Sequence, residues 1–272
     1  MERPDRIIDA HLHFQPDRSH FDVLAQAVGH TNSEAHLRHE YARLNIERGI
    51  VMGNRELSNT PHVYPKIFRY CVGIHQHALD PALSKESIAG AETQLRNPQC
   101  VGVKIYAGYC PLPIMDEAFR PYYELASAYN KPVAVHMGVT ASPNALLKHC
   151  HPLQLDELAV NYPNLTIVMC HFGNPWLMDA AAVVEKNNNV FVDLSGIIAG
   201  AFSLPDYLRS QSQYVDTLRM WINYVERDDA FMFGTDWPLV NLEEYIRFVS
   251  ELIPQSKWDD VFYNNAKAVY KL

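Results

Sequence analysis

The first apolar run of the sequence, 7–13 (IIDAHLH), carries side chains that commonly bind metals. Residues two apart on a strand point to the same face, so His11 and His13 can converge on one divalent ion. Asp9 has the same spacing, and we expect it on that face, where it either orients a histidine or is satisfied by backbone groups. A lone His-x-His motif is equally compatible with a strand that carries two histidines by chance.

Further polar residues stand at or just after the ends of later apolar runs. They are a lysine, two histidines and an aspartate: Lys104, His136, His171 and Asp236. Each has a simpler interpretation as a core histidine, a strand or helix cap, or half of a buried ion pair. Their recurrence at the ends of successive runs instead predicts that they surround one point together with the histidines of the first run.

The runs themselves predict a buried parallel sheet, because short, nearly continuous Val- and Ile-rich segments are typical of strands covered on both faces. Eight such runs occur: 7–13, 49–53, 67–74, 100–106, 132–137, 165–171, 190–195 and 230–235. Helical stretches separate most of them: 84–96, 119–129, 152–161, 175–187, 241–252 and 256–269. Two regions, 14–47 and 196–226, show no clear period, and we expect excursions there on the active-site side.

This alternation predicts α/β architecture, specifically a distorted (β/α)₈ TIM barrel over residues 1–272 as a single domain. In such barrels the chemistry lies at the C-terminal ends of the strands, so the metal site is expected at that mouth. No G-x-G-x-x-G follows the first run, which disfavours a dinucleotide-binding fold.

The composition restricts the classes of partner. The chain has 272 residues and a net charge of -8, and such an acidic balance disfavours nucleic acid and anionic membranes. No run approaches the ~20 apolar residues of a membrane span, and the charged start (MERPDR) leads us to expect no secretion signal. Five cysteines without a C-x-x-C pair favour reduced thiols. We therefore expect a cytoplasmic protein that acts on a small molecule, with a homodimer left open.

Taken together, the motifs resemble the amidohydrolase superfamily and, within it, the amidohydrolase-related (amidohydrolase 2) family. The resemblance rests on seven stretches in the family's order: DAHLH at 9–13, GVKIY at 102–106, KPVAVH at 131–136, YPNLTIVMCHFG at 162–173, NVFVDLS at 189–195, FGTDWP at 233–238 and NNA at 264–266. It is thinnest over 14–70 and 196–226. The combination is specific for the family and much less so for one reaction.

The resemblance implies one divalent ion, zinc or else Mn²⁺, Co²⁺ or Fe²⁺, with four ligands: His11, His13, His136 and Asp236. His171 matches a histidine that either touches the metal or positions the attacking water, and we expect it to share proton transfer with Asp236. Cys170 is expected on the opposite face of its strand from His171, which excludes it as a ligand.

Lys104 has two interpretations under the resemblance. Some superfamily members carbamylate this lysine to bridge two metals, whereas in this family it more often stays an amine that binds a substrate carboxylate. We favour a single metal and a cationic Lys104. Four further residues are candidate substrate contacts, although packing or surface charge explains them equally well: Tyr106, Arg55, His151 and Trp237.

These features lead us to expect a hydrolase that uses a metal-activated water on a small amide, ester or lactone, carrying a carboxylate. The first alternative is a lyase of the same family, either a non-oxidative decarboxylase or a hydratase. A TatD-type phosphodiesterase is disfavoured because that type carries glutamate where this chain has Lys104. A binding module with a structural metal remains the non-enzymatic alternative, and a closed ligand shell would distinguish it.

Overall fold

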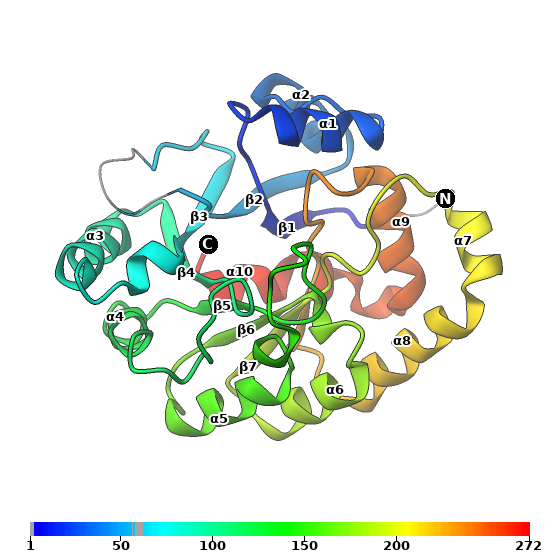
Figure 1. Cartoon of the computed structure of the whole chain (residues 1–272). Coiled ribbons are helices and arrows are strands. Elements are labelled where there is room, and N and C mark those ends of the chain that lie inside the picture. Colours follow the sequence, from blue (N-terminus) through cyan, green and yellow to red (C-terminus); the bar gives the residue numbers. More distant parts are fainter. Residues whose placement is uncertain (1–2, 56, 58–61) are drawn as a thin grey trace.

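Eight parallel strands form the centre of the protein in the computed structural model, which describes residues 3–55, 57 and 62–272 (Figure 1). Each strand pairs with the next along the chain: β1 (Ile7–Leu12), β2 (Ile46–Met52), β3 (Phe68–Ile74), β4 (Cys100–Ile105), β5 (Val133–His136), β6 (Ile167–Cys170), β7 (Val190–Asp193) and β8 (Phe231–Met232). Helices lie around the ring, as Figure 1 shows. The predicted TIM barrel is confirmed.

The ring closes between β8 and β1 through the segment that follows β8. Ala10 N–H donates to the Phe233 carbonyl at 2.9 Å, and His13 N–H donates to the Trp237 carbonyl at 2.8 Å. β8 is shorter than the predicted run 230–235, because the chain turns after it and reaches a left-handed conformation at Asp236 (φ 57°). This is the distortion that brings Asp236 over the end of β1.

Ten α-helices accompany the strands in the described residues: α1 (Ser19–Ala27), α2 (Glu34–Arg43), α3 (Ser84–Arg96), α4 (Arg120–Ala128), α5 (Leu153–Asn161), α6 (Leu177–Lys186), α7 (Leu204–Ser210), α8 (Ser212–Tyr224), α9 (Leu242–Leu252) and α10 (Asn265–Tyr270). The prediction for 84–96 matches α3, and four other predicted helices agree within one or two residues at each end. The predicted helix 256–269 is also helical throughout, but its type changes along the chain: a 3₁₀ turn (Gln255–Lys257), a π-helix (Asp260–Asn264) and α10 follow one another. Phe233 N–H donates to the Val261 carbonyl at 2.8 Å, which ties the π-helical segment to the barrel.

The two regions without a clear period contain four helices, α1 and α2 in the first and α7 and α8 in the second. The sequence of α2 shows only a weak helical periodicity, because the helix is polar and buries only Leu37, Glu40 and Tyr41. Its start is nevertheless defined, since the Ser33 side chain caps it by accepting from His36 N–H at 3.2 Å.

Apolar residues pack both outside and inside the ring. The inner cluster combines Ile8, Ala10 and other strand residues with Ala266, Val269 and Tyr270 of α10. α10 therefore packs on the interior of the barrel at its N-terminal end, which leaves the C-terminal ends of the strands for the site. No helix in the described part of the chain is long and apolar enough to cross a membrane.

Candidate metal centre and active-site cavity

Three side chains meet at the C-terminal end of the barrel, at the junction of β1 and the segment after β8. His11, His13 and Asp236 each offer one ligand atom, and these atoms lie within 4.8 Å of one another. Asp236 Oδ1 is 3.5 Å from His11 Nε2 and 3.3 Å from His13 Nε2. Sequence reasoning predicted these three residues as metal ligands, and the structure brings them together.

The cluster has the signature of a cation site. His11 Nε2 and Asp236 Oδ1 are buried, and neither has a hydrogen-bond partner among the residues that the structure describes. A buried polar atom without a partner destabilises the fold by ~1–3 kcal/mol, more when it is charged. Two imidazole nitrogens and a carboxylate oxygen form a donor set that suits a divalent ion such as Zn²⁺ or Mn²⁺. The residues present therefore fit the metal that the family resemblance implies.

His136 and His171 form a second contact beside the cluster. His171 Nε2 lies 3.1 Å from His136 Nδ1, and the rings of His171 and His11 are 4.8 Å apart. The structure thus places the predicted ligand His136 beside His171, outside the group of three ligand atoms. Its role as a ligand stays a prediction.

Hydrogen bonds at the other ring nitrogens define how this histidine pair is protonated. His136 Nε2 faces the Val139 carbonyl at 3.2 Å, and His171 Nδ1 faces the Ser195 carbonyl at 3.2 Å. Carbonyl oxygens only accept, so both of these nitrogens carry hydrogen. The facing His136 Nδ1 and His171 Nε2 are then both lone pairs, an arrangement that requires a shared proton or a nearby cation.

Asp193, at the end of β7, is the main support of the site that sequence reasoning missed. Its Oδ2 accepts from His11 Nδ1 at 2.8 Å, which leaves the lone pair of His11 Nε2 directed toward Asp236. Its Oδ1 accepts from His171 N–H at 3.0 Å and from Ser195 Oγ at 2.5 Å. The sequence signal for Asp193 was the stretch NVFVDLS, which contributed to the family resemblance. Neither Asp193 nor Ser195 of this stretch was predicted to have a role in the site.

Asp9, unlike Asp193, does not hold a histidine of the site. Its carboxylate accepts from Thr235 N–H at 2.9 Å, Thr235 Oγ at 2.7 Å and Tyr41 Oη at 3.2 Å, and no described histidine ring donates to it. A register shift in β1 between Asp9 and Leu12 breaks the strict alternation on which the expectation of a common face rested. Asp9 therefore ties β1 to the segment after β8, and Asp193 orients the histidine.

Burial and local charge determine which groups are ionised. Burial lowers the pKa of His11 to about 4 and lowers the pKa of His136 well below its ordinary value. Burial opposes ionisation of Asp236, yet the interactions with His13 and with the other adjacent imidazoles hold the pKa of this carboxyl below its usual range. The pKa of Asp193 is also lowered: burial opposes this, but the interaction with His11 outweighs it. The site thus offers neutral His11 and His136 imidazoles together with carboxylates, the forms that ligate metals.

The cluster lies in the wall of a cavity of about 770 Å³ at the mouth of the barrel. Aromatic rings follow one another along this wall: the ring centroid of His13 is 6.5 Å from that of Phe21 and 6.4 Å from that of Tyr106, which stacks on His75 at 4.9 Å. Tyr109 contacts the ring of His136 at 5.2 Å. A planar organic molecule fits such a wall, and the volume is within the usual range for small-molecule sites.

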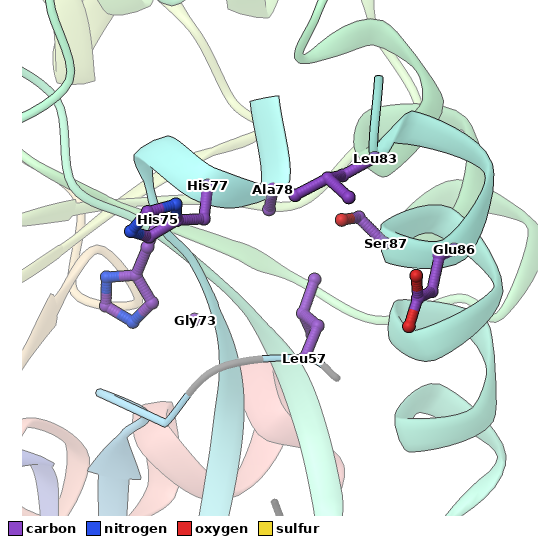
Figure 2. Close-up of a pocket in the computed structure, with 8 residues that line it drawn as sticks. All are labelled: Leu57, Gly73, His75, His77, Ala78, Leu83, Glu86 and Ser87. Carbon is purple, nitrogen blue, oxygen red and sulfur yellow. The ribbon is translucent and has the colours of Figure 1, made fainter. Parts of the chain in front are cut away.

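A second pocket of about 60 Å³ adjoins the cavity (Figure 2). His75 and His77 border both spaces, while Glu86 and Ser87 of α3 line the far side of the small pocket. It is too small for an aromatic ring, so the large cavity is the candidate active site.

Lys104 reaches the same cavity from β4 and is only 1% exposed. Its Nζ lies 2.9 Å from Cys170 Sγ, and no ion pair joins it to a carboxylate of the described residues. Burial raises the pKa of the Cys170 thiol well above its ordinary value, so the neighbour is a neutral thiol. A buried lysine amine without a carboxylate partner can pair with an anionic ligand.

The contact between Lys104 and Cys170 shows that Cys170 does not point away from the cavity side, although strand alternation predicted that it would. Cys170 is nevertheless not among the residues that could hold a metal ion in the described part of the chain. Cys170 points into the barrel as the last residue of β6. His171 then adopts a left-handed conformation (φ 63°), so strand alternation no longer relates the two side chains.

The remaining substrate candidates lie in different surroundings. Tyr106 lines the cavity, and its hydroxyl donates to the Gly53 carbonyl at 2.9 Å. Three others are absent from the described cavity wall: Trp237 packs against a histidine ring, His151 lies 3.5 Å from Asp179, and the Arg55 guanidinium lies 5.3 Å from the centre of the Tyr64 ring. Their substrate contacts stay predictions without support from the cavity geometry.

The fold is similar to several solved structures over nearly the whole chain. An uncharacterised TIM-barrel protein from Bordetella bronchiseptica has 19% identity and a TM-score of 0.71, covering 97% of this chain and 98% of its own. The 5-carboxyvanillate decarboxylase from Sphingomonas paucimobilis has 16% identity and a TM-score of 0.63, covering 98% and 99%. A dihydroxybenzoic acid decarboxylase from Polaromonas, solved with manganese and the inhibitor 2-nitroresorcinol, has 14% identity and a TM-score of 0.67, covering 100% and 98%.

No curated protein matches the chain significantly. The family model described as "Amidohydrolase" matches residues 69–272, which include most of β3, all of β4 to β8 and the positions of His136, His171 and Asp236. The barrel and the His/Asp cluster agree with that match, and the chain belongs to the amidohydrolase family.

Proposed function

We propose that this protein is a metal-dependent lyase that releases CO₂ from a small aromatic carboxylic acid. The observation that carries the proposal is one cavity in which a His/Asp cluster, a buried lysine and a row of aromatic rings share a wall. Decarboxylases among the similar structures support the lyase alternative better than the hydrolase that the sequence led us to expect first.

The metal would be held by His11, His13 and Asp236, with His136 as the further ligand that the family resemblance implies. When bound, a divalent ion supplies a Lewis acid that polarises oxygen groups of a substrate. Manganese in two similar decarboxylase structures supports a divalent ion, and nothing in the donor set favours zinc over manganese.

Side chains of the cavity would bind the substrate and transfer the proton. Lys104, buried in the wall, would pair with the carboxylate of the substrate, while the rings of His13 and Tyr106 would orient its plane. Decarboxylation breaks the bond between the ring carbon and the carboxyl carbon, and a proton replaces the departing CO₂. Asp236 is the group we expect to deliver that proton and to accept it again in the reverse direction. The alternative is His171, whose Nε2 lies 3.1 Å from His136 Nδ1.

A product assay on protein of known metal content tests the proposal. Purified protein should contain about one divalent ion per chain, and reconstitution with Mn²⁺ or Zn²⁺ should support CO₂ release from hydroxybenzoic acids in proportion to the acid consumed. His11→Ala should lose both metal and activity. His39→Ala is the matched control, since the His39 side chain is 75% exposed on α2.

Other products would reject the proposal in defined ways. Acid release from carboxylated lactones, esters or amides, without CO₂, would restore the hydrolase interpretation. A second ion per chain that is lost in Lys104→Ala would show a carbamylated Lys104 in place of the carboxylate-binding amine. Full activity of His11→Ala would place the site elsewhere.

A further inference from the structure

The cavity wall has a local excess of positive charge in an acidic protein. The whole chain has a net charge of -8, yet two Lys or Arg residues and a single carboxylate are present in the described part of the wall: Lys104, Arg18 and Asp236. A divalent ion would add two further positive charges. Such a cavity attracts a ligand with more than one negative charge.

Arg18 occupies a distinct place in this wall. It directly precedes α1, and Arg18, Phe21 and Leu24 all line the cavity at three-residue intervals. Phe21 N–H donates to the Arg18 carbonyl at 2.9 Å, which fixes the two residues in the same turn. One face of the start of α1 is therefore directed at the cavity, with a cation beside an aromatic ring.

Neither basic side chain of the wall forms an ion pair with a carboxylate of the described residues. Arg18 is exposed, and it makes no ion pair with any described residue, in contrast to Arg38 and Arg43 of the neighbouring α2. Lys104 is buried and contacts a neutral thiol. The cavity thus has one cation deep in the barrel and another at the segment that precedes α1.

We propose that Arg18 binds a second anionic group of the substrate, so that the preferred substrates are aromatic acids with two anionic groups on different parts of the ring. One carboxylate would lie near Lys104 and the metal ligands, and the other would pair with the Arg18 guanidinium. The Phe21 ring, whose plane is inclined at 67° to that of His13 with the centroids 6.5 Å apart, would contact the edge of the aromatic ring. This inference rests on the proposed function, because it assumes that the first carboxylate is the reacting one.

Binding of unreactive probes tests the role of Arg18 directly. Calorimetric titration of the manganese-loaded protein at low salt should show that terephthalate or isophthalate binds about five- to tenfold more tightly than benzoate, as expected for one charge-assisted pair. Arg18→Gln should remove this advantage and leave benzoate affinity within about twofold. Arg18→Lys should retain part of it, because the charge remains without the planar fork.

The matched control is Arg38→Gln, which removes the same charge from an exposed site on α2. Arg38→Gln should leave the affinities for benzoate and for the dicarboxylates unchanged. This result would separate a local contact with Arg18 from the effect of net charge. Equal weakening of benzoate and the dicarboxylates by Arg18→Gln, or no dicarboxylate advantage in the unmodified protein, would overturn the inference. CO₂ release without Arg18-dependent discrimination rejects this inference alone, and discrimination without CO₂ release rejects the proposed reaction alone.

Discussion

Each imidazole of the site is held through one ring nitrogen, and this leaves the other nitrogen available to a cation. His11 is held by the Asp193 carboxylate at 2.8 Å, whereas His13 faces the Met52 carbonyl at 3.1 Å. A carboxylate partner raises the basicity of the ligand nitrogen more than a carbonyl does, because it carries a full charge. His11 is therefore the most strongly supported ligand of the cluster.

Replacing Asp193 tests this support. Asp193→Asn keeps the size of the side chain but removes the charge that faces His11 Nδ1, and we expect about 10–100-fold weaker metal binding. A competition titration against a chelator measures the change. Asp206→Asn, at an exposed position on α7, is the control and should bind metal as the unmodified protein does. Unchanged affinity in Asp193→Asn would remove Asp193 from the metal site.

Asp236 is expected to combine metal binding with proton transfer. Asn keeps one oxygen of the carboxylate but has neither its charge nor its basicity, so Asp236→Asn should retain some metal and lose about 10²–10⁴-fold in kcat. His171→Asn should also slow turnover, with a smaller effect on metal content. Metal analysis and kcat measured on the same preparations compare the two variants. Near-normal kcat in metal-loaded Asp236→Asn would assign the proton to another group, with His171 as the first candidate.

At the scale of elements, the segments after the strands position the site through backbone conformations that strands do not use. His171, Phe172 and Asp236 all have positive φ, between 47° and 63°. Such conformations cost about 1–3 kcal/mol each for residues other than glycine. Gly196, after β7, adopts φ 62° without this cost and lies against the same side chains.

Gly196 offers a sharp test of this packing. A Cβ at this position would lie 2.6 Å from His171 Nδ1 and 3.0 Å from Asp236 Oδ2, so Gly196→Ala must displace a functional side chain. We expect kcat to fall about 10–100-fold, because small misplacements of reacting groups have effects of that size. Gly200→Ala is the control: Gly200 also has positive φ (91°), but a Cβ there meets nothing within 4 Å. Equal losses in both variants would attribute the effect to backbone strain alone.

At the scale of the whole molecule, His30 joins the N-terminal segment to the start of α9. His30 Nε2 accepts from Leu242 N–H at 3.1 Å, so its hydrogen is on Nδ1, which donates to His36 Nε2 at 2.8 Å. The His30 ring also packs against Trp237 at 5.0 Å. These contacts connect α2, α9 and the segment that carries Asp236, and they require His30 to be neutral.

Acid should weaken this connection. Burial, with the neighbouring His36, lowers the pKa of His30 from 6.5 to about 4. The unfolded chain therefore takes up a proton before the folded protein does, and the free energy of unfolding should decrease as the pH falls from 6.5 toward 4. We expect His30 to account for a loss on the order of 2 kcal/mol.

Denaturant unfolding of metal-free protein at pH 7.5, 5.5 and 4.5 measures this loss. His30→Asn should be less stable at pH 7.5 and should show a flatter dependence on pH than the unmodified protein. Parallel pH dependences of the two proteins would show that other groups account for the acid sensitivity.

The sequence alone determined the barrel and predicted the three residues of the His/Asp cluster. Hydrophobic runs at regular intervals specify buried strands locally, and the parallel topology places their ends at one mouth. His11, His13 and Asp236 were found in this way, because each stands at or beside the end of such a run. The family resemblance supplied the role of these residues, and the family match confirmed the resemblance.

Only the tertiary structure decided what supports that cluster. The alternation of side chains along a strand fails where β1 changes register and where His171 and Asp236 adopt positive φ. For this reason the side chains of Asp9 and Cys170 do not point in the directions that alternation predicted. The bond between His11 and Asp193 joins residues 182 positions apart, and no local pattern encodes such a contact. Arg18 also entered the cavity wall only through the packing of α1, because a side chain acquires a role in a site when long-range contacts bring its element there.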